Sequence, residues 1–500
     1  TGTNLASLTP VVANDEFWGH QSEVMFNASA GTIYRVAVDG WMNSSGKVCL
    51  NFAFPELAST NSPLGTAVNK SGTNVTGVTF RVWAPNASAV SVRGQFNGWN
   101  ETVMSKDPAA DYWSVTDSSA RPGQEYKYFL RWAGNSNGAW KVDPRAVWVR
   151  NGNGVIYDQG NFDWGTVTRP SIPADRQVAY EMHVGTFNDP DPKDGRPGTF
   201  WDAIKRLDYL QRLGVNVVAL MPVNEFGGDY SWGYNPHYPF AIEDAYGGPD
   251  GLKSFVKAAH QRGIKVQIDV VHNHWLENST NVARADTVWE FDGPSNIYFS
   301  SGDGSSTDWG PRPDFEKTEV RRYISDQIET LLADFRIDGL RWDSPENITG
   351  KDLFVRPSGK AMMAAINRMI RSQYPGVWSV AETANLLTVR AAPDGDLLSV
   401  PNLEESFHGH WNDGFYSDVI NGITQAPPKF SRFTNNLTSW SDGPGYRVIF
   451  SDNHDKAGGQ HNKKSDGVPF MRLANRIDSN NPLGLTARKK SLLSGVLTLT

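Results

Sequence analysis

From about residue 170 onward, short apolar runs alternate with longer amphipathic runs, and this pattern constrains the fold most. Residues 178–183 form the first apolar run. Residues 201–213 follow with helical spacing and end before Gly214, a common helix terminator. Units of this kind place their strands parallel in one sheet. Further strands are predicted at residues 215–221, 264–271, 337–343, 377–382, 406–411 and 447–452. An eighth strand, at or beyond Val496, would close an α/β fold of the (β/α)8 TIM barrel type.

The residues in front of this alternation are β-patterned, with short alternating runs separated by turns. They predict two small all-β sandwich domains, at 1–62 and 63–168, before a catalytic barrel at 169–500. Residues 63–74, rich in Ser, Gly, Asn and Thr, are predicted to be a linker. The chain begins without Met and ends inside an apolar run. We therefore expect a fragment at both ends, with the barrel incomplete at its C-terminal end.

Composition narrows the function classes. Of the 500 residues, 39% are hydrophobic and 20% are charged, which is typical of globular proteins. The net charge of -7 argues against a nucleic-acid partner, and no apolar run is long enough to cross a membrane. The single cysteine, Cys49, leaves no internal disulfide and no cysteine-based zinc cluster. The oligomeric state stays open.

The stretch from Phe335 to Ser344 is predicted to be a buried strand that ends at a carboxylate. Side chains alternate along a strand, so Arg341 and Asp343 share one face, whereas Asp338 lies on the other. A nearby guanidinium keeps a carboxylate ionised, and an ionised Asp at a strand end can act as a nucleophile. A purely structural ion pair explains this stretch equally well.

Polar clusters recur at the predicted carboxyl ends of four strands. They are residues 269–274, Arg341 with Asp343, Glu382, and His454 with Asp455. In a barrel these strand ends meet at one face, where active sites lie. Four clusters on one face would be hard to attribute to chance.

The chemistry of these clusters fits a retaining glycosidase, which needs two carboxyl groups about 5–5.5 Å apart. Asp343, beside a guanidinium, suits the ionised nucleophile. Glu382, after an apolar run, suits the protonated donor. Asp455 would grip sugar hydroxyls, and His274 and His454 would hydrogen-bond the same hydroxyls.

These clusters resemble the four short motifs of the α-amylase superfamily of glycoside hydrolases. The motif Asp-x-Val-x-Asn-His is met by residues 269–274, Gly-x-Arg-x-Asp by 339–343, the lone Glu by Glu382, and Asn-His-Asp by 453–455. The resemblance implies Asp343 as nucleophile, Glu382 as acid/base and Asp455 as transition-state stabiliser. It implies five substrate-binding residues: Tyr234, Asp269, His274, Arg341 and His454.

The front of the chain carries two further resemblances. Residues 30–40 resemble the end of bacterial pre-peptidase C-terminal-type β domains, which are accessory modules of secreted proteins. Residues 75–165 resemble the immunoglobulin-like starch-binding module that precedes the barrel in branching enzymes, isoamylases and trehalohydrolases. This copy would either bind glucan or act only in packing. We expect secretion from a bacterium, or a cytoplasmic location if the chain is a branching enzyme.

The domain order resembles the branching-enzyme branch of the family, but the motifs depart from it at Val270-Val271-His272, Thr383 and Lys456. We therefore predict a retaining glycoside hydrolase acting on α-1,4-glucans such as starch, glycogen and maltooligosaccharides. The alternative is a 1,4-α-glucan branching enzyme, which transfers the same covalent glucosyl unit to a sugar hydroxyl. A second alternative is a catalytically silent glucan-binding protein.

Several other polar and aromatic residues are open to simpler explanations. His272 and His237 are expected to be loop hydrogen-bonders. Asn273 corresponds to a position that binds calcium in some family members, yet no aspartate-rich loop accompanies it, so no cofactor or metal is predicted and structural calcium stays an alternative. Three tryptophans would line sugar subsites or simply pack: Trp275, Trp309 and Trp411.

Overall fold

The computed structural model describes residues 64–107, 111–277, 287–293, 296–349, 357–382, 407–411, 413–424, 446–458 and 485–499. The predicted front domain at 1–62, Cys49 and Thr383 lie outside these residues. The domain boundaries at 62/63 and 168/169 stay predictions. Among the described residues, no helix is both long enough and apolar enough to cross a membrane.

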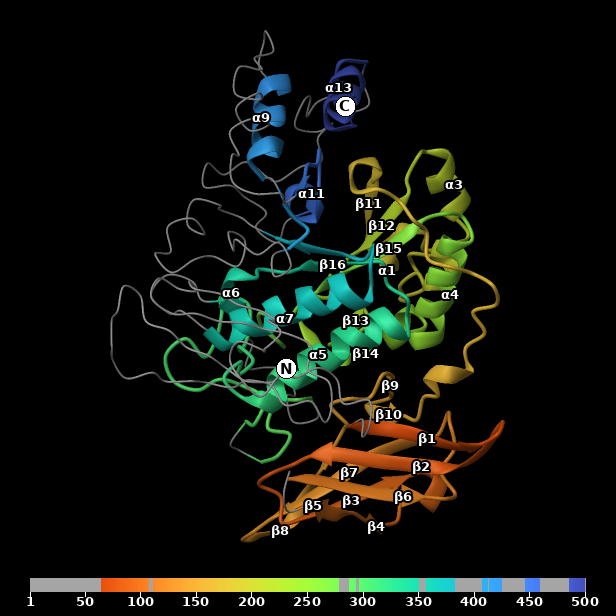
Figure 1. Cartoon of the computed structure of the whole chain (residues 1–500), viewed down its shortest axis with the longest axis vertical. Helices are drawn as coiled ribbons and strands as arrows, with labels where there is room; N and C mark the ends of the chain where they lie inside the picture. The colour runs from red at the N-terminus through yellow and green to blue at the C-terminus, as the bar shows by residue number, and fades with distance from the viewer. Residues whose placement is uncertain are drawn as a thin grey trace, which may run out of the picture.

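The first described unit is a β-sandwich (orange in Figure 1). One of its sheets has the order β1 (Gly65–Ser71), β2 (Asn74–Trp83), β6 (Tyr112–Asp117), β5 (Ser105–Asp107). The other runs β4 (Thr102–Val103), β3 (Ala89–Gly94), β7 (Glu125–Trp132), β10 (Asn153–Val155), β9 (Val149–Arg150), with β8 (Asn135–Lys141) on β7. Fully buried Val78, Phe80, Val92, Tyr126 and Leu130 fill the core.

The predicted linker at residues 63–74 is wrong for most of its length. β1 pairs antiparallel with β2, with Val68 opposite Val78 and Ser71 opposite Asn74. Polar, turn-forming composition favours a loop, but the backbone hydrogen bonds of a hairpin outweigh local propensity. The turn lies at Gly72, whose φ of 61° suits glycine.

The second unit is a seven-stranded parallel sheet, which confirms the predicted α/β barrel class. Its order follows the chain: β11 (Ala179–Met182), β12 (Val217–Leu220), β15 (Lys265–Val270), β16 (Gly339–Trp342), β17 (Trp378–Ala381), β18 (Gly409–Trp411), β19 (Tyr446–Val448). These strands coincide with the seven predicted runs to within a few residues. The antiparallel pair β13 (Asn224–Phe226) and β14 (Pro236–Ile242) follows β12.

Helices accompany this sheet as in βα units, among them α4 (Gly248–His260), α5 (Thr318–Ala333) and α7 (Pro357–Gln373), visible in Figure 1. Leu340 and Trp342 of β16 are fully buried in one hydrophobic cluster with Ile328 and Leu331 of α5. This burial gives β16 the predicted parity and leaves Arg341 on the opposite face.

Two predicted elements of the barrel need correction. The helix at 201–213 is divided into α2 (Phe200–Ile204) and α3 (Leu207–Arg212), because Arg206 leaves the helical region with ψ near 1°. The eighth strand is not found at Val496, since residues there belong to helix α13 (Leu485–Leu499). An apolar run of this length does not distinguish a strand from a helix.

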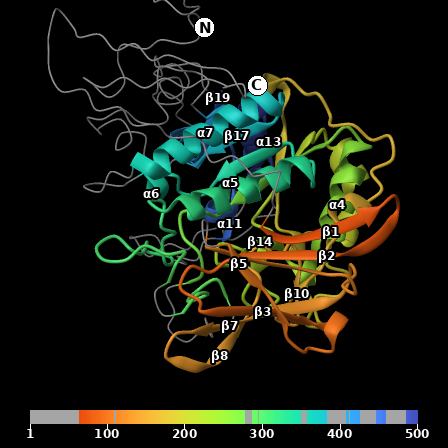
Figure 2. The ribbon, with the colours of Figure 1, turned by 60° about the horizontal axis from the view of Figure 1, so that its bottom comes forward.

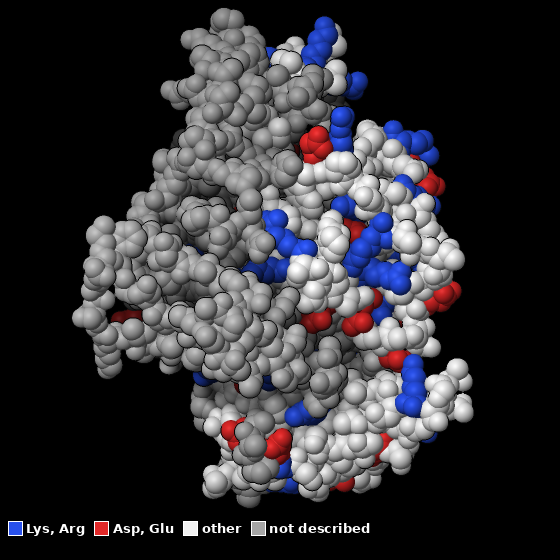
Figure 3. Space-filling view, in the orientation of Figure 1, with Lys and Arg blue, Asp and Glu red and all other residues white. Residues whose placement is uncertain are grey.

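The sandwich docks directly on the barrel unit, as Figure 2 shows. Arg145 is buried and pairs with Asp326 of α5, while the Tyr323 hydroxyl donates to the Pro144 carbonyl at 2.7 Å. Asp292 accepts from the indole of Trp132 at 2.9 Å. On the face shown in Figure 3, both acidic and basic side chains are scattered over the described residues.

We predict that Arg145→Ala loosens this interface. The change leaves the carboxylate of Asp326, only 14% exposed, without its guanidinium partner. Loss of one partner of a buried ion pair costs about 3–5 kcal/mol. Tryptophan fluorescence during urea unfolding should show a lower midpoint.

Arg176→Ala is the matched control, because Arg176 is 78% exposed and pairs with Asp175 only at 3.9 Å. The free energy of unfolding of this variant should stay within about 0.5 kcal/mol of the wild-type value. Equal shifts in the two variants would contradict the interface account.

Candidate active site

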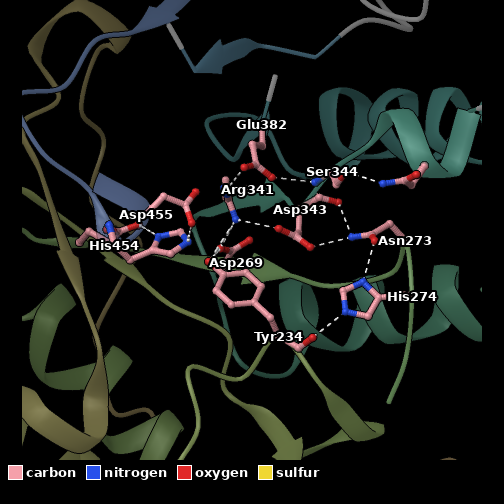
Figure 4. Close-up of polar contacts among 12 residues, drawn as sticks. Tyr234, Asp269, Asn273, His274, Arg341, Asp343, Ser344, Glu382, His454 and Asp455 are labelled. Atoms are coloured by element: carbon pink, nitrogen blue, oxygen red, sulfur yellow. Dashed lines mark hydrogen bonds and ion pairs between the residues drawn. The ribbon is translucent and has the colours of Figure 1, made fainter. Parts of the chain in front are cut away.

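Three neighbouring strands bring charged side chains to one edge of the sheet. Asp269 of β15 lies opposite Arg341 of β16 in the parallel register. Asp343 follows the end of β16, and Glu382 follows the end of β17. The carboxyl ends of parallel strands share one edge, so these four side chains converge, as Figure 4 shows.

The guanidinium of Arg341 is the centre of this group, and the residue is only 2% exposed. Its Nη1 pairs with Asp269 and lies 3.3 Å from Asp343, while Nη2 lies 3.0 Å from Glu382. The hydroxyl of Tyr234, in the loop between β13 and β14, donates to Asp269 at 2.5 Å. Burial is compatible with this charge because carboxylates surround it.

Asp343 is held by two neighbouring residues besides Arg341. The Asn273 amide donates to its carboxylate at 2.7 Å and to its backbone carbonyl at 2.9 Å. The carbonyl oxygen of that amide is 2.6 Å from Nδ1 of His274, whose Nε2 lies 2.7 Å from the Tyr234 carbonyl. This chain fixes the orientation of Asp343.

Glu382 accepts the backbone N–H of Ser344 at 2.9 Å. A hydrogen bond also joins the carboxyl groups of Glu382 and Asp343. The two carboxyls are therefore near enough to act as a pair, as a retaining site requires.

The pKa shifts of this pair run in the opposite direction to the roles expected from sequence. Burial and the charge of Glu382 raise the pKa of Asp343 well above its usual range. Although burial acts against it, Arg341 and the Ser344 N–H lower the pKa of Glu382. Sequence spacing places Arg341 beside Asp343 alone, whereas in the fold it is slightly nearer to Glu382. The two groups titrate as one coupled unit.

His454 and Asp455 begin helix α11 (His454–Gly458), after the seventh strand. Nε2 of His454 is 3.5 Å from Asp455, which is half exposed, and its ring stacks on Tyr234 with centroids 5.1 Å apart. The structure thus brings all eight predicted residues into one connected network: Tyr234, Asp269, His274, Arg341, Asp343, Glu382, His454 and Asp455.

The remaining polar residues considered for the site make contacts within the fold. His272 is buried and lies 3.2 Å from Gln327, and His237 lies 3.0 Å from Glu277, so both make hydrogen bonds within the fold. Asp338 is buried on the other side of the sheet and bonds His260 at 2.7 Å.

The calcium alternative at Asn273 would require rearrangement, because both ends of its amide are engaged by Asp343 and His274. The described part of the chain holds no group of three or more His, Cys, Asp or Glu placed for a metal.

The three tryptophans differ from one another. Trp275 is fully buried and packs against Tyr323, so it belongs to the core. Trp309 is 45% exposed, with its ring 6.1 Å from that of His274. The guanidinium of Arg341 lies 4.2 Å above the ring of Trp411. The last two lie beside the site.

Sequence reasoning missed Glu181, which binds His454 through both carboxylate oxygens. The available signal was its position near the carboxyl end of the first predicted strand, which matches that of the other site residues. The contact with Ser344 had no such signal, since it is made by the backbone.

Two family models match the chain. Residues 63–146 match carbohydrate-binding module 48 (isoamylase N-terminal domain), and residues 181–285 match the alpha amylase catalytic domain.

The similar curated proteins include branching enzymes and a trehalohydrolase. The 1,4-alpha-glucan branching enzyme of Pseudoalteromonas atlantica is 28% identical over 386 residues, covering 71% of this chain and 51% of the relative. That of Nitrosomonas europaea is 30% identical over 442 residues, covering 80% and 57%. The malto-oligosyltrehalose trehalohydrolase of Saccharolobus solfataricus is 33% identical over 274 residues, covering 54% and 44%. The chain spans about half the length of these relatives.

Solved structures agree on the fold. A pullulanase from Bacillus acidopullulyticus gives a TM-score of 0.67 at 21% identity, covering 89% of this chain and 57% of that one. A putative alpha amylase from Salmonella typhimurium gives 0.60 at 24% identity, covering 79% and 66%. At these identities the likeness concerns architecture.

We predict that His274 makes stability depend on pH. Burial lowers the pKa of His274 from 6.5 to about 4, so the unfolded chain binds the extra proton between these values. Stability should therefore rise with pH through this window and level off above it, by on the order of 3 kcal/mol for this residue. Urea unfolding of wild type and His274→Gln at pH 4, 5, 6 and 7 measures the contribution.

The variant should lose less stability than wild type between pH 7 and pH 4. A residual slope is expected, because burial also lowers the pKa of His272 to about 4. Parallel curves for the two proteins would contradict the neutral state of His274.

Proposed function

This chain belongs to the α-amylase superfamily, and on that premise we propose that it cleaves α-1,4-glucans through a covalent glucosyl-Asp343 intermediate. The observation that carries the proposal is the contact of Asp343 and Glu382 with each other and with the buried Arg341. Two carboxyl groups that can flank one anomeric carbon are the minimum a retaining mechanism needs.

In the proposed reaction, the carboxylate of Asp343 attacks the anomeric carbon as Glu382 gives its proton to the departing glycosidic oxygen. Glu382 then removes a proton from the acceptor, whose oxygen displaces Asp343. The pKa directions of the two groups favour the opposite distribution of the proton, so we propose that one proton passes from Asp343 to Glu382 as the sugar arrives. Asp455 and His454 would bind sugar hydroxyls.

The acceptor decides between transfer and hydrolysis, and here we depart from the preference expected from sequence. Several relatives are named as branching enzymes and match 70–80% of this chain. They support a sugar hydroxyl as acceptor, and hence formation of α-1,6 branches. His272, one departure from the branching motif, points into the core toward Gln327, where it does not select the acceptor.

Hydrolysis is the second candidate. It is supported by the 33% identity to a trehalohydrolase and by Lys456 directly after the His-Asp pair. A silent glucan-binding protein is disfavoured, because all three expected carboxylates belong to one network.

We propose an α-glucan poly- or oligosaccharide as the partner, since both matched modules are of carbohydrate-active types. On the sandwich, Trp140 is 38% exposed and its ring lies 6.0 Å from that of Trp99. These rings offer a surface on which sugars stack. The names of the relatives do not support secretion. If the chain is a branching enzyme, as proposed, we expect a cytoplasmic location.

Incubation with amylose tests the choice of acceptor. We expect iodine colour to fall without new reducing ends, while proton NMR shows new α-1,6 anomeric signals. Reducing ends that rise in proportion to the loss of colour would instead establish hydrolysis.

We predict that Asp343→Asn lowers turnover by about 10⁴-fold or more, because the amide cannot form the glucosyl intermediate. Glu382→Gln should lose about 10²–10⁴-fold on glucan, because no proton reaches the leaving oxygen. It should lose much less on α-maltosyl fluoride, whose leaving group needs no proton. Initial rates on both substrates measure the difference.

Asp208→Asn serves as the control, since Asp208 pairs with Arg262 on the outer surface of α3. It should keep wild-type rates. Wild-type rates in Asp343→Asn would contradict its role as nucleophile, and an inactive wild type would favour the glucan-binding alternative.

A further inference from the structure

We propose that Glu181 is a positioning residue that fixes His454 and Asp455 over the reacting sugar by joining the first strand to the segment after the seventh. The inference rests on the proposed function for the roles of His454 and Asp455, and extends it to a residue outside the four motifs.

The contact is bidentate. One carboxylate oxygen of Glu181 accepts the backbone N–H of His454 at 2.6 Å, and the other lies 2.9 Å from its ring Nδ1. A single side chain thereby fixes both the start of α11 and the orientation of the imidazole. Asp455 is the next residue along the backbone, so its position follows from the same contact.

The contact joins the two ends of the sheet. β11 and β19 are the two edge strands of the seven-stranded sheet among the described residues. Glu181 lies on β11, and His454 follows β19 by six residues, although the two are 273 positions apart in sequence. Backbone ladders join each strand only to its neighbours in this order, whereas the Glu181–His454 contact links β11 directly to the segment that follows β19.

Aromatic rings surround the imidazole that Glu181 holds. Tyr234 stacks on it at 5.1 Å and 24°, Trp232 meets it edge-on at 5.6 Å, and Trp411 lies 6.2 Å away. Aromatic faces stabilise a cation, so this cage suits imidazolium. Tyr234 is the aromatic residue expected beneath the sugar. Because Tyr234 stacks on His454, Glu181 also helps to position Tyr234 through His454.

The charges around His454 favour the same state. Burial and Arg341 lower the pKa of His454, but Glu181 outweighs them and, with Asp455, raises it above its ordinary value. Among the described residues, Asp269 and Glu382 also interact with the His454 charge, which acts to lower their pKa values against the effect of burial. With Nδ1–H directed at Glu181, Nε2–H is left to face Asp455 and the sugar.

The test compares Glu181→Gln with wild type by NMR titration of the His454 imidazole, whose signal is assigned with His454→Gln. Glutamine keeps the size and one acceptor but removes the charge. We expect the His454 titration to move to lower pH and the alkaline limb of kcat/KM on amylose to move with it. We also expect kcat to fall on the order of 100-fold with KM changed little, as for a transition-state misalignment.

Glu277→Gln is the matched control, because Glu277 also bonds a histidine, His237, at 3.0 Å. It should leave the His454 titration unchanged. Glu181→Asp, which keeps the charge, should retain more of the wild-type pH profile than Glu181→Gln.

An unchanged His454 titration and alkaline limb in Glu181→Gln would overturn the proposal, as would equal kcat in Glu181→Gln and wild type. A fall in thermal stability with an unmoved pH profile would also overturn it, by reducing Glu181 to a structural contact. If the wild type proves inactive on glucans, the proposed function fails separately. The NMR titration then still decides whether Glu181 sets the state of His454.

Discussion

One buried guanidinium organises this protein's polar centre. Arg341 meets Asp269, Asp343 and Glu382 from three consecutive strands, in a setting where water is nearly excluded. Removing several charges from water costs more than their mutual attraction usually returns. Such a cluster is therefore a poor way to stabilise a sheet. A role in holding the carboxyl groups close together and in a fixed orientation explains the cluster at the strand ends better than a role in stability.

The balance of charges in the cluster limits its protonation. Five acidic groups, Glu181, Asp269, Asp343, Glu382 and Asp455, face two cationic ones, Arg341 and His454. Ionising every carboxyl around these two cations would leave an excess of negative charge, part of it buried. The raised pKa of Asp343, and that of Asp269 at about 6, relieve this excess. A retained proton, which a retaining mechanism requires, is thus a consequence of the same crowding.

Much of this could be predicted from the sequence, because strand parity and position are local properties. The burial of Leu340 and Trp342 is enough to place Arg341 and Asp343 at the site. The failures have non-local causes. The strand at residues 65–71 depends on its partner in the hairpin, and the apolar run at Val496 fits a helix as well as a strand. Two further features have no local signal: the pKa directions of Asp343 and Glu382 depend on distances from Arg341 across strands, and the contact of Glu181 depends on a residue 273 positions away.

The sandwich and the active site share one element, which explains why the two units form a continuous structure. Helix α5 receives the sandwich through Tyr323 and Asp326, and its chain then leads directly into β16 with Arg341. Arg145 lies against the rings of Tyr323 and Phe240, so the docking contact is both ionic and aromatic. A displacement of the sandwich would thus act on the helix immediately before the site's central strand. The position of the sandwich relative to the carboxyl groups is therefore set largely through α5.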